Sequence, residues 1–298
     1  MSEVLLSEQP ESRASLDLPE GRPVGLVAGW GRFPVSVAET LARRGHPVYC
    51  IAIRGHALSE LETVCQSTLW SGVGRFGRHI RFFKRHGIGH VTLAGKLFKS
   101  ELLYHGSLLL KHRPDWTCLK TFWPLLMGPN RDARDDRLLG AVIDTYQRNA
   151  MRICAATELA PDLLVDAGVL TQTQPQHKQT RDMELGWEIA KAMGGFDIGQ
   201  AITIKDGTVL AVEAIEGTDA CIQRTGELCP RGGWTLIKVS KPNQDMRFDV
   251  PTIGTRTVDR VQDAGGTMIA IEANKTILLD QAETIRRADQ HGITIVAR

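Results

Sequence analysis

The chain has 298 residues, and its 36 lysines and arginines nearly balance 34 aspartates and glutamates, leaving a formal net charge of +2. This balance argues against a general nucleic-acid binder, because such proteins gain affinity by neutralising many phosphates. Domains commonly have about 100–200 residues, so the length predicts two domains, each with its own core.

Three further features narrow the class of protein. No apolar run reaches the roughly 18 residues that a membrane span needs. The six cysteines form no C-x-x-C pair, which disfavours a disulfide framework or structural zinc and favours a cytoplasmic protein. Residues 1–22 lack the basic and apolar parts of a signal peptide, so we expect a disordered or loosely attached tail.

The first half alternates apolar runs with amphipathic segments. We expect strands at 24–28, 48–53 and 91–94. Helices are expected after the first strand, ending at Gly45, at 76–86, and at 138–146 after the opening pair Asp135 and Asp136. Strands separated by helices are typical of a doubly wound parallel sheet, so residues 23–158 are expected to form a Rossmann-like domain.

The second half has a different texture, with shorter strands and fewer helices. A polar stretch at 171–182 precedes two or three expected helices and six expected strands at 201–204, 209–214, 236–239, 268–272, 276–279 and 293–296. Residues 165–298 are therefore expected to form a mixed α/β catalytic domain, with the active site in the cleft between the two domains.

Two glycine turns close strands of the first domain. Gly29 and Gly31 follow the first strand, and Gly95 and Lys96 follow the third, so both turns should lie at the sheet edge that binds ligands. A dinucleotide fingerprint is rejected, because Pro34 stands where a third small residue is needed and the second strand ends in Arg54 rather than an acid. A phosphate- or sugar-binding turn and a plain tight turn stay equally open.

The segment 75–86 is basic and amphipathic. It could lie on anionic lipid or attract an anionic substrate. A surface helix with a solvated basic face is the more ordinary interpretation.

Acidic residues gather after the strand expected at 209–214. Glu213, Glu216 and Asp219 fall within seven residues, and Thr218 or Asp219 is expected to cap the next helix. A cap does not explain Glu213, since a carboxylate in an apolar strand is costly unless it is paired or metal-bound.

The segment before Pro251 alternates polar and apolar residues. If it is extended, Asp245, Arg247 and Asp249 share one face above an apolar one. A guanidinium binds phosphate oxygens, and carboxylates hold Mg²⁺ or orient water, although a strict strand places the two aspartates about 13 Å apart, too far to share an ion. A surface ladder of ion pairs is the plain alternative.

The sequence lacks a G-x-S-x-G motif, a Walker loop and clustered histidines, so carboxylates with lysine and arginine favour metal-assisted phosphoryl or nucleotidyl transfer.

Several of these motifs together resemble the LpxI family, the UDP-2,3-diacylglucosamine pyrophosphatases of lipid A biosynthesis. The resemblance runs from about Gly25 to the C-terminus, with its most specific motifs in the second half. Its blocks are 25–29, 94–96, 135–136 with 138–139, 185–186, 197–200, 211–220, 241–242, 244–245 and 247–254. Trp30 and the residues before Val24 depart from the family pattern.

The resemblance implies hydrolysis of UDP-2,3-diacylglucosamine to UMP and 2,3-diacylglucosamine 1-phosphate, with water attacking the α-phosphorus and Mg²⁺, or alternatively Mn²⁺, as cofactor. It places the key aspartate of an Arg-x-Asp-x-Pro-Thr motif at Asp249. We therefore expect Asp249, Asp219 and Asp245 to be catalytic, and Asp249, Asp219 and Glu213 to bind the metal. The expected substrate-binding residues are Gly29, Gly31, Gly95, Lys96, Asp135, Gln200, Glu216, Gly217, Thr218, Lys241, Gln244, Arg247 and Thr252.

The expected partner is the glycolipid nucleotide-sugar, with no nucleic acid, transient contact with the inner membrane, and a homodimer. The location implied is cytoplasmic, peripheral to the inner membrane. Two alternatives stay open: a phosphatase or nucleotidyl transferase acting on another nucleotide-sugar, and a non-catalytic nucleotide- or lipid-binding regulator.

Overall fold

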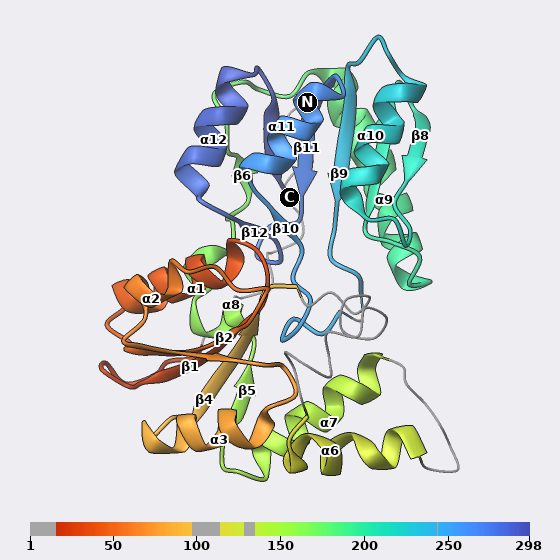
Figure 1. Cartoon of the computed structure of the whole chain (residues 1–298). Helices are drawn as coiled ribbons and strands as arrows, with labels where there is room; N and C mark the ends of the chain where they lie inside the picture. Colours follow the sequence, from red (N-terminus) through yellow and green to blue (C-terminus); the bar gives the residue numbers. More distant parts are fainter. Residues whose placement is uncertain (1–15, 97–113, 128–134, 243) are drawn as a thin grey trace. The chain divides into compact units, whose positions relative to one another are not determined.

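A computed structural model describes residues 16–96, 114–127, 135–242 and 244–298 (Figure 1). The structure does not describe the side chains at 124–127 and 135–136, so the expected role of Asp135 lies outside it. Most of the tail expected at residues 1–22 also lies outside the described residues. The chain divides into two compact units, one ending at Pro161 and the other beginning at Asp162.

The first unit is built on a five-stranded parallel sheet, which confirms the Rossmann-like fold. The strand order is β3-β2-β1-β4-β5. The strands are β1 (Val24–Ala28), β2 (Val48–Ile53), β3 (Ser67–Ser71), β4 (His90–Ala94) and β5 (Arg152–Cys154). The edge strand β3 was not predicted, because its mixed sequence Ser-Thr-Leu-Trp-Ser is mostly half-buried and lacks a strong apolar pattern.

Helices cover both faces of this sheet. They are α1 (Phe33–Arg43), α2 (Leu61–Val64), α3 (Phe76–Arg85), α6 (Trp116–Met127), α7 (Asp135–Gln147) and α8 (Ala156–Leu159). The strand order reverses between β1 and β4, so right-handed crossovers place α1 and α2 on one face and α3 on the other, as Figure 1 shows. The three helices predicted for this half are confirmed.

The second unit is a mixed α/β structure, as predicted. Its six-stranded sheet has the order β6-β13-β11-β9-β7-β8, in which β13, β11 and β9 are parallel and the other pairings are antiparallel. These strands are β6 (Gly168–Val169), β7 (Ala201–Lys205), β8 (Thr208–Val212), β9 (Trp234–Lys238), β11 (Gly266–Ile271) and β13 (Thr294–Ala297). A separate parallel pair joins β10 (Thr252–Ile253) and β12 (Ile277–Leu278).

The second unit has four α-helices within the described ranges, whereas the sequence predicted two or three. They are α9 (His177–Gly195), α10 (Thr218–Leu228), α11 (Thr255–Asp263) and α12 (Gln281–Gln290). One core contains Met183 and Ala190 of α9 packed on β7 and β9, and another surrounds the buried Trp234 with residues of α10, α11 and α12. The indole of Trp234 donates a hydrogen bond to the carbonyl oxygen of Ala264 (3.0 Å).

Among the described residues, no helix has the length and hydropathy needed to cross a bilayer.

Candidate functional site

In the first unit, the turns after β1 and β4 are joined by their backbones. The amide of Trp30 donates to the carbonyl oxygen of Lys96 (2.8 Å), and the amide of Lys96 donates back to Trp30 (3.1 Å). A Cβ on Gly29 would lie 2.7 Å from the Lys96 oxygen, and one on Gly95 would lie 2.7 Å from the Trp30 oxygen. These glycines are therefore explained by close approach of two loops at the point where the strand order reverses. Ligand binding by Gly29, Gly31, Gly95 and Lys96 stays a prediction.

In the second unit, polar residues gather at one edge of the sheet. Glu213 follows β8, Ser240 lies just after β9, and Glu272 follows β11. Gln200 precedes β7, which is antiparallel to β8 and β9 and therefore begins at the edge where these strands end. This edge, here called the strand-end site, contains several of the residues that the sequence nominated.

Glu213 is buried and hydrogen-bonded within its own unit. Only 6% of the residue is exposed, and its carboxylate accepts hydrogen bonds from the Thr218 hydroxyl (2.8 Å) and the Gln200 amide (3.4 Å). The expected capping role of Thr218 or Asp219 is wrong, because Gly217, with a φ of 83°, precedes α10 and no side chain caps the helix. The Thr218 hydroxyl is used by Glu213 instead.

The Glu216 side chain contacts residues near it in the sequence. Its carboxylate accepts from the Ala214 amide (3.2 Å) and pairs with Arg224 (2.8 Å). Hydrogen bonds to the carboxylate from the backbone amide of Glu216 itself and from the Arg224 side chain lower the pKa of Glu216. The side chain thus stabilises the turn before α10.

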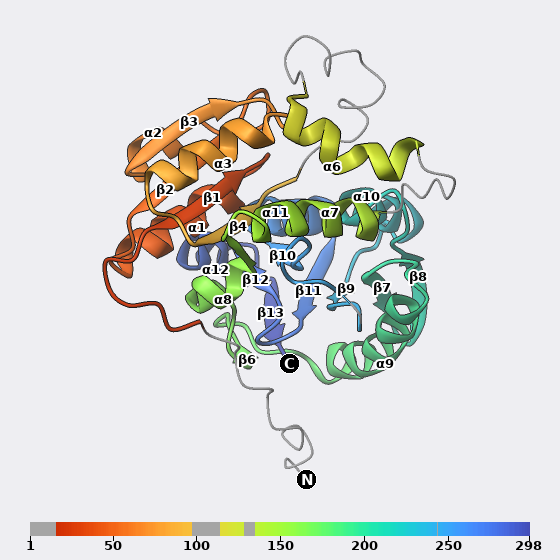
Figure 2. The same ribbon diagram turned by 90° about the horizontal axis from the view of Figure 1, so that it is seen from below.

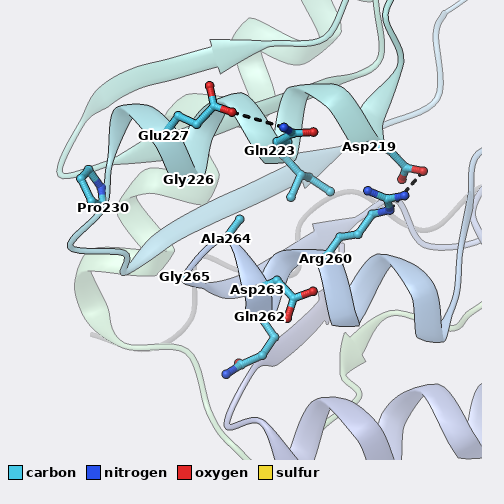
Figure 3. A pocket seen from close by; sticks show the side chains of 11 residues that line it. Asp219, Gln223, Gly226, Glu227, Pro230, Arg260, Gln262, Asp263, Ala264 and Gly265 are labelled. Carbon is cyan, nitrogen blue, oxygen red and sulfur yellow. Dashed lines mark hydrogen bonds and ion pairs between the residues drawn. The ribbon is translucent and has the colours of Figure 1, made fainter.

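Asp219 lies at one end of a groove between α10 and α11. The groove has a volume of about 610 Å³ and is lined by polar and apolar residues of the two helices and their ends (Figure 3). Asp219 pairs there with Arg256 (2.7 Å) and Arg260 (3.3 Å). Of the nominated residues only Asp219 lines this groove, so the cavity and the strand-end site coincide poorly.

The segment from Asp245 to Asp249 forms a turn, and the expected extended conformation is wrong. The amides of Phe248 and Asp249 both donate to the Asp245 carbonyl oxygen, at 3.0 and 3.1 Å. The Asp245 side chain accepts the Arg247 amide (3.0 Å), a local bond by which aspartate favours turns over strands. The alternation of faces therefore does not apply.

Arg247 holds Asp245 through two nitrogens. Its Nη2 lies 2.6 Å and its Nε 2.9 Å from the carboxylate oxygens, and the guanidinium lies 5.6 Å from the centroid of the Phe248 ring. Hydrogen bonding from Arg247 lowers the pKa of Asp245 despite partial burial. This part of the motif matches the ion-pair alternative that the sequence left open.

Asp249 is exposed and has a different partner. Gln244 donates from Nε2 to its Oδ2 (2.7 Å). The Gln244 side-chain oxygen accepts the Lys241 amide (2.9 Å) and the Ser240 hydroxyl (3.2 Å), and its Nε2 lies 3.5 Å from Gln200. Gln244 thus connects Asp249 to the end of β9.

An ion pair between a half-buried lysine and a buried glutamate supports this loop, and neither residue was nominated from the sequence. Lys191 of α9 donates to both carboxylate oxygens of Glu272, at 2.6 and 2.7 Å, and to the Ser240 carbonyl oxygen at 3.1 Å. Glu272 also accepts the Ser240 amide (2.8 Å) and is 7% exposed. An acidic residue closing an apolar strand was the available signal, as it was for Glu213.

Two further nominated residues occupy the same loop. Lys241 pairs with Asp197 (2.6 Å), and the Thr252 hydroxyl donates to the Val250 carbonyl oxygen (2.8 Å). Lys238, which was not nominated, is 8% exposed and donates to the Thr252 carbonyl oxygen (3.0 Å). These contacts fix the path of the chain from β9 to β10.

The three carboxylates expected to bind metal have separate partners. Glu213 is held by Thr218 and Gln200, Asp219 by two arginines, and Asp249 by Gln244. Within the described ranges, no three histidine, cysteine, aspartate or glutamate side chains gather as a metal site. A single carboxylate with substrate phosphates is nevertheless a common way to hold Mg²⁺, and exposed Asp249 fits that role.

Both halves of the chain match known family models. Residues 23–163 match the LpxI N-terminal domain, and residues 166–296 match the LpxI C-terminal domain. A protein of Caulobacter vibrioides named UDP-2,3-diacylglucosamine pyrophosphatase LpxI is 30% identical over 282 residues. The alignment covers 92% of this chain and 97% of that protein, so the similarity extends across both units.

Proposed function

This chain belongs to the LpxI family, and we propose that it hydrolyses the pyrophosphate bond of UDP-2,3-diacylglucosamine to UMP and 2,3-diacylglucosamine 1-phosphate in lipid A biosynthesis. The similarity over nearly the full length of a relative with that name supports the reaction class. The structural observation that supports it best is the exposed Asp249 carboxylate, held by Gln244 at the end of parallel strands.

In the proposed reaction, Asp249 orients the attacking water or binds the metal. Gln244 holds Oδ2, and no described residue donates a hydrogen bond to Oδ1, so one oxygen can face a ligand. Mg²⁺, with Mn²⁺ as the alternative, would neutralise pyrophosphate charge and activate water when bound. Asp249 and the substrate phosphates would hold it.

Lys241 and Arg247 are proposed to bind the pyrophosphate. Both already pair with a carboxylate, Asp197 and Asp245 respectively, so the substrate must compete with these partners. Both ion pairs are partly solvent-exposed, and such pairs typically contribute about 0–1 kcal/mol. Replacing the carboxylate partner by a substrate phosphate therefore costs little free energy.

The proposal is tested by UMP release from UDP-2,3-diacylglucosamine in ¹⁸O-labelled water, with and without EDTA. Metal-dependent release with the label in UMP is expected. Label in the sugar phosphate would exclude attack at the α-phosphorus, and release only from another nucleotide-sugar would favour the alternative substrate class.

Asp249→Asn should lower kcat by about 10²–10⁴-fold, the usual contribution of a positioned acid–base group. Its matched control is Asp206→Asn, since Asp206 is exposed and lies 3.9 Å from Lys178 on a distant turn. Equal activity of the Asp249→Asn variant and the control would exclude Asp249 from the reaction.

We further propose that the protein works in the cytoplasm with transient contact at the inner membrane, because a diacylated substrate belongs in a bilayer. A homodimer stays a prediction, which analytical ultracentrifugation would test.

A further inference from the structure

The helix α6 exposes an unusual stripe of large apolar residues. Trp116 is 70% exposed, Leu119 41% and Trp123 61%. Their spacing of three and four residues places them on one side of the helix. Exposed apolar groups gathered in this way commonly mark an interaction surface.

The opposite side of α6 is firmly packed, so the stripe belongs to an ordered helix. The Asp115 carboxylate accepts the amides of Gly77 (2.7 Å) and Cys118 (3.0 Å), which ties the start of α6 to α3. The ring of Phe122 lies 5.7 Å from that of Phe76, and the hydroxyl groups of Thr121 and Thr145 lie 2.9 Å apart.

Exposed basic residues lie on α3, the helix that contacts α6. Phe76, Ile80 and Phe83 are buried, whereas the exposed positions of the helix include Arg78, Arg81, Lys84 and Arg85. In the described part of the chain, no carboxylate forms an ion pair with any of these four residues. The ammonium group of Lys120 adds a charge within the stripe, 5.5 Å from the Trp116 ring centroid.

The charges and the stripe belong to one layer of the first unit. Helices α3 and α6 are in contact, and Figure 2 shows them on the same side of the parallel sheet. Their outward residues therefore contribute to a common surface, here called the α3–α6 face: Arg78, Arg81, Lys84, Arg85, Trp116, Leu119, Lys120 and Trp123.

We propose that the α3–α6 face docks on the surface of an anionic phospholipid bilayer. Tryptophan favours the membrane–water interface, and lysine and arginine are attracted to anionic headgroups. A second copy of the chain fits less well, because symmetric pairing through this face would bring like charges together. The choice of a bilayer rests on the proposed function, whose substrate carries two acyl chains.

The test is co-sedimentation of the full chain with vesicles of phosphatidylcholine, with and without phosphatidylglycerol. Binding is expected only with the anionic lipid and should weaken as salt rises, because surface charges are then screened. The variant Arg81→Glu/Arg85→Glu should lower the binding constant at least tenfold, since one basic residue near such a surface contributes about fivefold. The variant Trp116→Ala/Trp123→Ala should also lower it at least tenfold, because it removes two side chains that favour the membrane–water interface.

The matched control is Leu228→Ala/Arg231→Glu, which makes the same kinds of change at exposed residues of the other unit. It should bind vesicles like the unmodified protein. Equal binding by all variants, or no binding to anionic vesicles at low salt, would overturn the assignment. A dimer in solution that dissociates when the tryptophans are replaced would also overturn it, by identifying a second copy as the partner.

Activity on detergent-dispersed substrate separates this proposal from the proposed function. UMP release without vesicle binding would overturn the docking surface alone. Vesicle binding that depends on the α3–α6 face, without UMP release, would support docking and overturn the enzymatic proposal.

Discussion

At the scale of single residues, the Glu272 carboxylate connects three parts of the second unit by hydrogen bonds. It accepts hydrogen bonds from Lys191 of α9 and from the Ser240 amide after β9, and it follows β11 itself. Ser240 in turn donates to Gln244, which donates to Asp249. The position of the exposed carboxylate therefore depends on a buried charge two hydrogen-bonded residues away.

Glu272→Gln keeps the side-chain shape but removes the charge opposite Lys191. We expect a loss of about 2 kcal/mol in the free energy of unfolding, between the values for exposed and fully buried pairs, because the half-buried Lys191 loses its closest counter-ion. Urea denaturation measures this loss. Lys191→Met/Glu272→Gln should recover much of it, and Glu283→Gln, at an exposed pair with Arg286, should cost less than about 1 kcal/mol. Similar losses for Glu272→Gln and Glu283→Gln would contradict this account.

His79 gives the first unit a pH-dependent stability. Burial is the largest effect and lowers its pKa to about 4, even though the ring contacts the Gly72 carbonyl oxygen at 3.1 Å. An unfolded histidine has a pKa of about 6.5, so between these values the unfolded state binds a proton that the folded state does not. Stability is therefore complete above about pH 6.5 and declines as the pH falls toward 4.

Urea denaturation should give a free energy of unfolding that is about 2 kcal/mol smaller at pH 5 than at pH 7 because of His79. This figure is the free energy of protonating the unfolded histidine, with its pKa of about 6.5, at pH 5. His79→Gln should remove this part of the pH dependence, because glutamine does not titrate. An NMR titration giving His79 a pKa near 6.5 in the folded protein would refute the prediction.

At the scale of elements, the paired turns after β1 and β4 require glycine. Gly29→Ala places a methyl group 2.7 Å from the Lys96 carbonyl oxygen, so one backbone must move. We expect a cost of about 1–3 kcal/mol, as for other overpacked sites. Gly140→Ala is the matched control, because no atom lies within 4 Å of the added carbon in α7 and alanine favours helix by up to about 1 kcal/mol.

Thermal unfolding should therefore move in opposite directions for the two alanine variants. A rise in the melting temperature for Gly29→Ala would show that the turns relax freely and that close approach does not explain this glycine.

At the scale of the whole molecule, each large sheet described in the structure is complete within one unit. The parallel sheet uses only strands before residue 155, and the mixed sheet uses only strands after residue 167. Fragments 15–161 and 162–298 should therefore fold separately. The near-ultraviolet circular dichroism of fragment 162–298 should show ordered tryptophan side chains, Trp234 being fully buried, and a featureless spectrum would mean that the second unit needs the first.

The sequence predicted the regular elements well where their pattern is local. The strands Val24–Ala28 and Val48–Ile53 have the bounds expected from their apolar runs, and α3 lies within the helix expected at 76–86. The same kind of reasoning failed at Asp245–Asp249, because the local hydrogen bond from the Arg247 amide to Asp245 competes with an extended chain.

By itself, the sequence determined the Rossmann-like first domain, the mixed second domain and the family, because apolar periodicity and long motifs are properties of neighbouring residues. Only the tertiary structure decided which partner each charged group has. Lys191 and Glu272 are 81 positions apart, and Asp219 meets Arg256 from another helix. Such pairs depend on where strands and helices meet in space, and no local pattern in the chain records that distance.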